Sequence, residues 1–217
     1  MLSTKILENL TNIKEQIIGK KVFIFDLETT GLFDKKSYYK YWDNSVFDTS
    51  RIVEIGYYYS DNFGLDFETN NIIHSYLRKP TDFDSIDPRA EEVHKISMND
   101  LKLNGYTFSR ILNQDLIAKL NNCNVIISHN TLFDYSILLN ELYRFKLHNT
   151  IQHLQSIKQN NNLICTCRAS GYKRLNVLYH LIFDKEPSIT HRAGDDVNTL
   201  MEIIIKEHLN LNYKLSL

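Results

Sequence analysis

The stretch that most constrains the fold is "KVFIFDLETTGL" at residues 21–32. Its alternating pattern is typical of a β-strand that runs into a glycine turn. With a period of two, Val22 and Ile24 face one side, and Phe23, Phe25 and Leu27 face the other. A strand this hydrophobic is expected to lie in the middle of a sheet, buried on both faces.

The rest of the chain predicts four more strands and at least five helices around this strand. Strands are predicted at residues 51–60, 72–80, 125–130 and 163–167, and helices at 3–19, 108–120, 132–145, 172–183 and about 193–208, with irregular chain between 80 and 98. The first three strands can form a meander, and the later ones alternate with helices. This order indicates an α/β domain whose mixed sheet is covered by helices.

Composition excludes several classes of protein. The 217 residues fit one globular domain or one domain with a short appendage. Lys and Arg number 25 against 26 Asp and Glu, so the chain has no overall basic field to attract nucleic acid. Cys123, Cys165 and Cys167 cannot build a disulfide framework and are expected to be free thiols in a reducing compartment. Without a membrane-spanning hydrophobic run, the chain is expected to be soluble and cytoplasmic.

Two acids follow the hydrophobic part of the first strand on one face. Asp26 and Glu28 share the side of Val22 and Ile24, one step apart. Neighbouring carboxylates in a buried strand repel each other unless a cation neutralises them, which indicates a metal site. The alternative is that both acids lie past the edge of the sheet in water, and this stretch alone does not decide between the two.

A third acid, Asp134, begins the helix that follows the strand at 125–130. It shares a helix face with Ile137 and Leu138, which directs it toward the core. It also lies beyond the carboxyl end of a buried strand, where ligand sites of open α/β sheets form. The alternative is an ordinary helix cap, for which aspartate is common.

The last predicted helix starts with two adjacent acids in "HRAGDDV". Asp196 lies three residues after Ala193 and four before Leu200, so helical phase places it on the hydrophobic face. Asp195 instead aligns with the polar residues Asn198 and Glu202 and is expected to face water. The sequence therefore predicts that Asp196 alone of the pair joins the other carboxylates.

His191 lies five residues before Asp196, close enough to approach the same site. A histidine has an ordinary pKa of about 6.5, which suits removal of a proton from water near neutral pH. Carboxylates without cysteine ligands favour Mg²⁺ or Mn²⁺ over zinc. Two such ions, about 3.5 to 4 Å apart, can clamp the attacking and leaving oxygens of a phosphodiester.

The segments "FDLETTGL", "RIVEIG", "HNTLFDYSIL" and "HRAGDDV" resemble, in order and approximate spacing, those of the DEDDh 3′-5′ exonucleases. That family includes the proofreading epsilon subunit of bacterial replicative polymerase. "IDPRAEEVHKIS" resembles the connecting segment that its members often carry. The resemblance covers roughly residues 21 to 208, and the three acidic motifs are specific only in combination.

The resemblance implies a ribonuclease H-like fold with a mixed five-stranded sheet flanked by helices. It implies that two divalent ions are held by four ligands, and that His191 is the general base. The implied ligands are Asp26, Glu28, Asp134 and Asp196. The implied reaction is hydrolysis of the last phosphodiester from the 3′ end, which releases a nucleoside 5′-monophosphate. The substrate is expected to be a nucleic acid, with single-stranded or mismatched DNA 3′ ends favoured over short RNA.

The resemblance also implies contacts with the terminal nucleotide. The backbone around Thr29 and Gly31 would approach it, Leu32 would lie beside its base, and Glu54 would bind its 3′-hydroxyl. The implied division is an N-terminal amphipathic helix at 1–20, an exonuclease domain at 21–210 and a tail at 211–217. A non-catalytic nucleic-acid-binding or polymerase-associated scaffold is the alternative of another class.

Two features depart from the family's pattern. Residues 33–50 form a longer insertion than many members carry, and its aromatic residues either stack on nucleic-acid bases or fold onto the domain as an extended hairpin or flap. Those aromatic residues are Tyr38, Tyr39, Tyr41 and Trp42. The N-terminal helix either packs on the domain or joins a homodimer or a polymerase partner.

Overall fold

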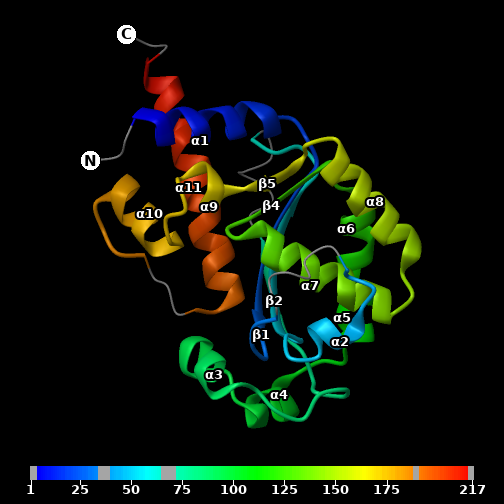
Figure 1. The fold of residues 1–217 in the computed structure, drawn as a ribbon. Helices are drawn as coiled ribbons and strands as arrows, with labels where there is room; N and C mark the ends of the chain where they lie inside the picture. The colour runs from blue at the N-terminus through cyan, green and yellow to red at the C-terminus, as the bar shows by residue number, and fades with distance from the viewer. Residues whose placement is uncertain (1–3, 34–39, 65–71, 188–190, 215–217) are drawn as a thin grey trace.

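The computed structural model describes residues 4–33, 40–64, 72–187 and 191–214, with side chains placed as far as residue 205. Its centre is one five-stranded sheet in the order β3-β2-β1-β4-β5 (Figure 1). The strands are β1 (Val22–Thr29), β2 (Ile52–Ser60), β3 (Ile73–Leu77), β4 (Val125–Ser128) and β5 (Leu163–Cys165). The first three pair antiparallel, whereas β4 and β5 run parallel to β1. The predicted meander and mixed sheet are confirmed.

Helices cover both faces of the sheet, as Figure 1 shows. One layer consists of α1 (Thr4–Ile17), α9 (Thr166–Ala169), α10 (Leu175–Phe183) and α11 (Ala193–Lys214). The opposite layer contains α5 (Phe108–Ile111), α6 (Ile117–Asn122), α7 (Thr131–Arg144) and α8 (His148–Gln159). The short α2 (Asn44–Phe47), α3 (Pro88–His94) and α4 (Met98–Asn104) lie near the end of the sheet at which β1 finishes. Among the described residues, none of the helices has the length and hydrophobicity needed to cross a membrane.

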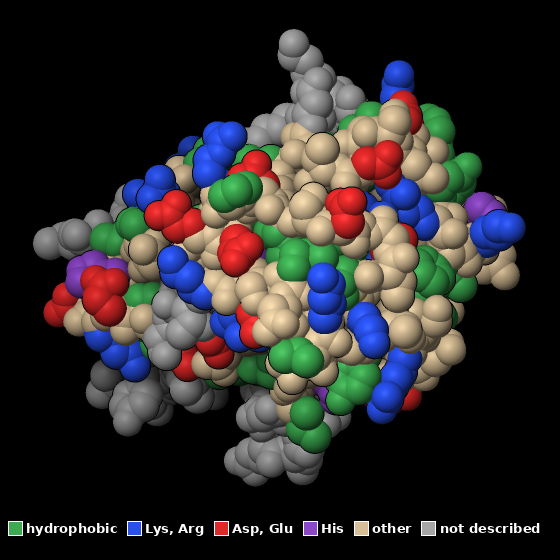
Figure 2. All heavy atoms as spheres, turned by 90° about the horizontal axis from the view of Figure 1, so that it is seen from below, with side chains coloured by type: hydrophobic (Ala, Val, Ile, Leu, Met, Phe, Trp, Pro, Cys, Tyr) green, Lys and Arg blue, Asp and Glu red, His purple; other side chains and the backbone are tan. Residues whose placement is uncertain are grey.

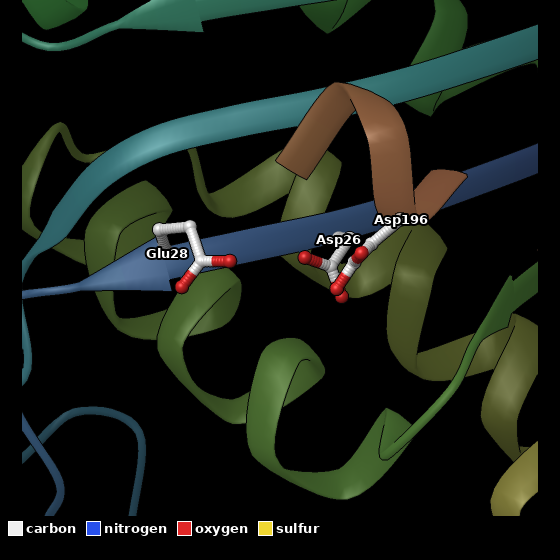
Figure 3. A group of neighbouring side chains, drawn as sticks. All are labelled: Asp26, Glu28 and Asp196. Atoms are coloured by element: carbon white, nitrogen blue, oxygen red, sulfur yellow. The ribbon is translucent and has the colours of Figure 1, made fainter. Parts of the chain in front are cut away.

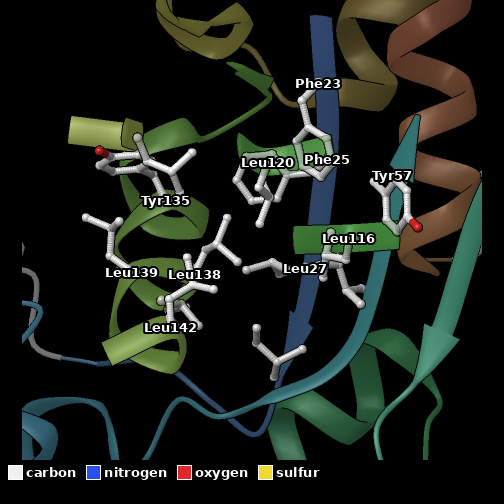
Figure 4. Packing of buried hydrophobic residues seen from close by; sticks show 14 of the residues in the cluster. Phe23, Phe25, Leu27, Tyr57, Leu116, Leu120, Tyr135, Leu138, Leu139 and Leu142 are labelled. Carbon is white, nitrogen blue, oxygen red and sulfur yellow. The ribbon is translucent and has the colours of Figure 1, made fainter. Parts of the chain in front are cut away.

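The two faces of β1 carry the side chains that its period of two predicts. Phe23, Phe25 and Leu27 are buried in the core formed with α7, which Figure 4 shows. Val22 and Ile24 belong to the other core, under α1, α10 and α11. Asp26 and Glu28 therefore emerge on the α11 side, where this second core ends.

Three predicted elements differ in the structure. The helix expected at 108–120 is interrupted, because Gln114 and Asp115 leave helical geometry and Asp115 has a φ of 71°. The stretch predicted to be irregular, residues 80–98, contains α3, and α4 begins where it ends. The first turns of both helices are fixed by side-chain caps, from Asp87 and Ser97. The strand expected at 163–167 ends at Cys165, where the short helix α9 begins.

The amphipathic face of α1 is part of the main core. Ile6, Leu10, Ile13 and Ile17 are all buried and pack in the cluster that also holds residues of β1, β4 and α11. The stripe read from the sequence is therefore the packing face of the helix.

Close approach of backbones seats the start of α11 on β2. A Cβ added to Gly56 would lie 2.3 Å from the carbonyl carbon and 2.4 Å from the oxygen of Ala193. Gly56 is also the register partner of Asp26 on β1. The contact thus brings the first turn of α11 over the position of Asp26.

We expect Gly56→Ala to lower the free energy of unfolding by about 1–3 kcal/mol, because the new methyl group meets rigid backbone. Urea unfolding followed by circular dichroism measures the effect. Asn198→Ala, on the exposed face of α11, is the control and is expected to unfold like the wild type. An unchanged midpoint for Gly56→Ala would show that α11 is not seated as described.

Candidate metal centre and active site

Three carboxylates from β1 and α11 form the densest acidic group of the described chain. Oxygens of Asp26, Glu28 and Asp196 all lie within 4.8 Å of one another. Figure 3 shows the side chains of Asp26 and Asp196 directed toward each other, with Glu28 one step further along β1. All three side chains are only partly exposed. Asp26 and Glu28 are therefore not fully solvated beyond the edge of the sheet, which was the alternative to a metal site.

Asp134 approaches the same region from α7. It lies in the first turn of the helix, is only 4% exposed, and accepts a hydrogen bond of 3.4 Å from Ser128 Oγ. The N-cap position belongs to Asn130, so Asp134 is not the cap of its helix. Asp134 is not one of the three acids that meet within 4.8 Å, although its charge acts on both Asp26 and Glu28.

The electrostatics of the group favour a bound cation. Burial, and then the charges of Asp134 and Asp196, raises the pKa of Asp26 well above its usual value. Burial and the neighbouring acids raise the pKa of Glu28 to about 9 and that of Asp196 to about 7. Burial raises the pKa of Asp134 to about 8 despite the hydrogen bond from Ser128. Four acids that resist ionisation together are stabilised by a positive charge placed among them.

The donor set fits a hard divalent cation. Every ligand offered is a carboxylate oxygen, the donor type that Mg²⁺ and Mn²⁺ prefer. In addition, Oδ1 of Asp196 is buried and has no hydrogen-bond partner among the described residues. A buried carboxylate oxygen without a partner costs free energy, which a metal ion bound to it would offset.

The two adjacent aspartates of α11 point in different directions. Asp196 belongs to the carboxylate group, whereas Asp195 is exposed. Helical phase placed them in this way from the sequence. The exposed residue still matters to its neighbour, because the charge of Asp195 raises the pKa of Asp196 after the larger effect of burial.

Glu54 lies opposite Glu28 on β2 and is 2% exposed. Its carboxylate accepts hydrogen bonds from Arg192 Nε and Nη2, at 2.9 and 2.8 Å, and from the amide of Ala193 at 3.0 Å. Ser75 Oγ donates a further bond of 2.8 Å. In the structure Glu54 thus anchors the N-terminus of α11, and the contact with a 3′-hydroxyl stays a prediction.

Arg192 is the site residue that the sequence did not single out. Arg192 forms a bidentate ion pair with the buried Glu54. This pair holds Arg192, which directly follows His191, against the sheet. The signal was present in "HRAG", where an arginine precedes the helix that carries Asp196. Nothing in the local pattern identified its partner, which is 138 residues away.

His191 lies just ahead of α11 and is exposed, with a left-handed backbone φ of 50°. It is not one of the residues whose ligand atoms gather within 4.8 Å. The structure thus brings three predicted ligands, Asp26, Glu28 and Asp196, into one group, and the charge of the fourth, Asp134, acts on two of them. His191 lies outside this group.

Three of the four predicted nucleotide-contact residues, Thr29, Gly31 and Leu32, line a pocket of about 500 Å³ that Glu28 also lines, whereas Glu54 is not in its lining. Thr29 and Gly31 are joined by a 2.8 Å hydrogen bond from Thr29 Oγ1, and Leu32 is 72% exposed at the mouth. His94 Nε2 lies 3.2 Å from the Thr29 carbonyl, while His94 Nδ1 accepts from the amide of Ile96. His94 therefore donates to Thr29 and fixes this backbone, a role that the sequence did not reveal.

The aromatic insertion folds partly onto the domain. Tyr41 packs edge-on against Tyr143 of α7, and its carbonyl accepts from Asn140. Trp42 is 53% exposed and stays a candidate for base stacking. Residues 44–47 form the short helix α2, so the described part of the insertion folds as a flap with a helical turn and not as a hairpin, which was one of the alternatives. The predictions for Tyr38 and Tyr39 fall outside the described residues.

Solved structures share this fold at low sequence identity. Pop2p of S. pombe, in a form with Mg²⁺ and Mn²⁺ bound, is 16% identical at a TM-score of 0.56, covering 95% of this chain and 90% of that one. Exonuclease I of E. coli, in a complex with single-stranded DNA and zinc, is 18% identical at a TM-score of 0.60. The match covers 87% of this chain and 40% of that one. The same enzyme with a dA16 oligonucleotide is 17% identical at a TM-score of 0.60, covering 86% and 41%. The chain thus spans about two fifths of exonuclease I.

No curated protein matches the sequence. The family comparison does match, over residues 23–204, which include all four acids of the site and the segment before α11. The match covers most of the chain, and the ribonuclease H-like sheet agrees with it. The chain belongs to the RNase_T exonuclease family of the DEDD superfamily.

Proposed function

We propose that this protein is a metal-dependent 3′-5′ exonuclease of the DEDDh type that releases nucleoside 5′-monophosphates. The observation that carries the proposal is the meeting of Asp26, Glu28 and Asp196 within 4.8 Å, with a buried Asp196 oxygen lacking a partner. Family membership and the fold shared with Pop2p and exonuclease I support it.

The proposed ligands of two Mg²⁺ or Mn²⁺ ions are Asp26, Glu28, Asp134 and Asp196. Bound divalent ions supply electrostatic stabilisation to the attacking and leaving oxygens of the phosphodiester. The imidazole of His191 takes the proton from the attacking water. His191 is exposed just before α11 and is therefore accessible for this role. Thr29 and Gly31 approach the terminal nucleotide through their backbone, with Leu32 beside the base, in the pocket that these three residues line. Glu54, opposite Glu28 on β2, binds the 3′-hydroxyl.

His191→Ala is expected to lower kcat by about 10²–10⁴-fold, the usual contribution of a general base. Hydrolysis of a 3′-labelled oligonucleotide in Mg²⁺ measures it. His180→Ala, an exposed histidine of α10, is the control and is expected to behave like the wild type. A fully active His191→Ala enzyme would remove this residue from the mechanism.

DNA with single-stranded or mismatched 3′ ends is the proposed substrate, and an exoribonuclease for short RNA is the alternative within the same chemistry. The two differ in how the site treats the 2′-hydroxyl. Digestion of single-stranded DNA, mismatched duplex DNA and RNA side by side, in Mg²⁺ or Mn²⁺ and with an EDTA control, separates them. Faster loss of RNA than of either DNA would favour the alternative.

The proposed partner is the nucleic acid itself, with a homodimer or a DNA polymerase as a further candidate. The three free cysteines support the expected cytoplasmic location. We place the exonuclease domain at residues 21–210, with the helix of residues 1–20 before it and a tail at 211–217 after it. The burial of α1 in the shared core supports a packing role for that helix.

A further inference from the structure

A basic and aromatic loop joins α9 to α10 on the side of the sheet that carries α11 (Figure 1). The loop, residues 170–174, presents Tyr172, Lys173 and Arg174, and Arg168 of α9 lies just before it. The Tyr172 side chain is 76% exposed, and both arginines are exposed. An exposed aromatic face flanked by cations has the composition of a surface that binds single-stranded nucleic acid.

The backbone of this loop is fixed. Gly171 and Tyr172 both have left-handed φ angles, of 71° and 62°. The Tyr172 amide donates to the Cys167 carbonyl at 2.7 Å, which closes the end of α9. His129 Nε2 lies 2.9 Å from the Lys173 carbonyl and donates to it. The Tyr172 ring is therefore displayed by a rigid turn.

The same contacts connect the loop to the elements that carry Asp134 and Asp196. His129 directly follows Ser128, whose hydroxyl donates to Asp134. On the other side, Leu175 opens α10 and packs in the core cluster that contains Val197, the residue after Asp196. The loop is thus hydrogen-bonded to the residue that follows β4, and the helix after the loop shares a core cluster with α11.

The cations of the loop are available for a ligand. Within the described part of the chain, Arg168, Lys173 and Arg174 take part in no ion pair. The pocket next to the nucleotide pocket measures about 850 Å³ and shares Gly31, Leu32 and Asp87 with it. Its charged side chains are already paired to a large extent, because Asp48, Asp82 and Asp87 form ion pairs with arginines.

Seen from the end of the molecule at which α3 and α4 lie, acidic, basic and hydrophobic side chains are interspersed over the described residues (Figure 2). Phosphates of a strand that leaves the active site are attracted by cations that have no acidic partner, such as Lys173 and Arg174. This attraction is local and does not depend on the net charge of the chain, which is -1.

We propose that the loop at residues 170–174 binds the single-stranded part of the substrate upstream of the scissile bond, with a base stacked on Tyr172 and phosphates on Lys173 and Arg174. This inference rests on the proposed function, because it assumes a nucleic-acid strand in the carboxylate site. Stacking on one aromatic ring, together with salt-dependent phosphate contacts, is how proteins grip single strands without reading sequence.

The test compares binding of a labelled twelve-nucleotide oligo-dT and its oligo-U counterpart by fluorescence anisotropy, in Ca²⁺ so that the strand is not cut. We expect Tyr172→Ala to raise Kd about tenfold and Tyr172→Phe to bind like the wild type, since Phe keeps the stacking face. The Lys173→Ala/Arg174→Ala double variant is expected to reduce the slope of log Kd against log salt by about 1.4, because each phosphate contact contributes about 0.7.

The matched control is Lys5→Ala/Lys146→Ala, which removes two exposed lysines elsewhere and is expected to leave Kd and the salt slope unchanged. Hydrolysis of a dinucleotide, too short to reach the loop, is expected to be unaffected by all these variants. If the Tyr172→Ala and double variants bind the oligonucleotides like the wild type, the inference about the loop is overturned, while hydrolysis of the dinucleotide still upholds the proposed function. If binding depends on the loop but the wild type hydrolyses no substrate, the loop inference is upheld and the proposed function is overturned.

Discussion

Asp196→Asn is expected to lower the rate of nucleic-acid hydrolysis by on the order of a thousandfold, the upper end of the cost of removing one electrostatic stabiliser from an active site. The substitution removes a charged oxygen from the group of three carboxylates that meet within 4.8 Å. Release of 3′-labelled mononucleotide in Mg²⁺, under single-turnover conditions, measures the chemical step directly.

Asp195→Asn is the matched control, because it makes the same chemical change one residue away. Asp195 is exposed and affects the site only through its charge on Asp196, so a mild effect is expected. Equal losses for the two variants would contradict the assignment of Asp196 as the inward residue of the pair.

The second large effect concerns stability without metal. In EDTA at pH 8, Asp26→Asn is expected to be more stable than the wild type by on the order of 2 kcal/mol, because burial and the neighbouring acids oppose ionisation of Asp26, and asparagine has no such ionisation. For a domain of this size, this raises Tm by about 4–8 °C. Differential scanning fluorimetry measures both proteins, and a lower Tm for Asp26→Asn in EDTA would show that the carboxylates do not repel one another.

The pH dependence has a definite sign. The folded protein holds protons on Glu28, Asp134 and Asp196, with pKa values of about 9, 8 and 7, that the unfolded chain releases near pH 4. This contribution to stability is complete below about pH 4 and is lost as the pH rises through these values. Without metal, Tm is therefore expected to fall between pH 5 and 9, and to fall less in Asp26→Asn.

Added Mn²⁺ is expected to reverse the order of the two proteins. A cation at 100 times its Kd stabilises the folded state by about 2.7 kcal/mol, and Asp26→Asn lacks a ligand for it. The wild type should then have the higher Tm. An identical Mn²⁺ shift in both proteins would remove Asp26 from the ligands.

The sequence predicted the parts of the site that depend on local periodicity. The period of two in β1 placed Asp26 and Glu28 on one face, and the phase of α11 separated Asp196 from Asp195. Both patterns are set by neighbouring residues whose burial decides which side faces inward.

Long-range contacts account for what the sequence did not predict. Glu54 and Arg192 are 138 residues apart, and nothing near either residue identifies the other as its partner. The break at Gln114 and Asp115 interrupts a run whose hydrophobic pattern is helical, so periodicity alone favoured one helix. His94 was likewise hidden, because its hydrogen bond to Thr29 spans 65 residues.

The most direct test of the central claim follows a 5′-labelled single strand in Mn²⁺ with the wild type and Asp26→Ala. The account predicts that the wild type shortens the strand one nucleotide at a time from the 3′ end, with nucleoside 5′-monophosphates as products and complete inhibition by EDTA. Asp26→Ala is expected to leave the strand intact. Equal behaviour of the two proteins, or internal fragments in place of a ladder, would contradict the assignment of the carboxylate group as a 3′-5′ exonuclease site.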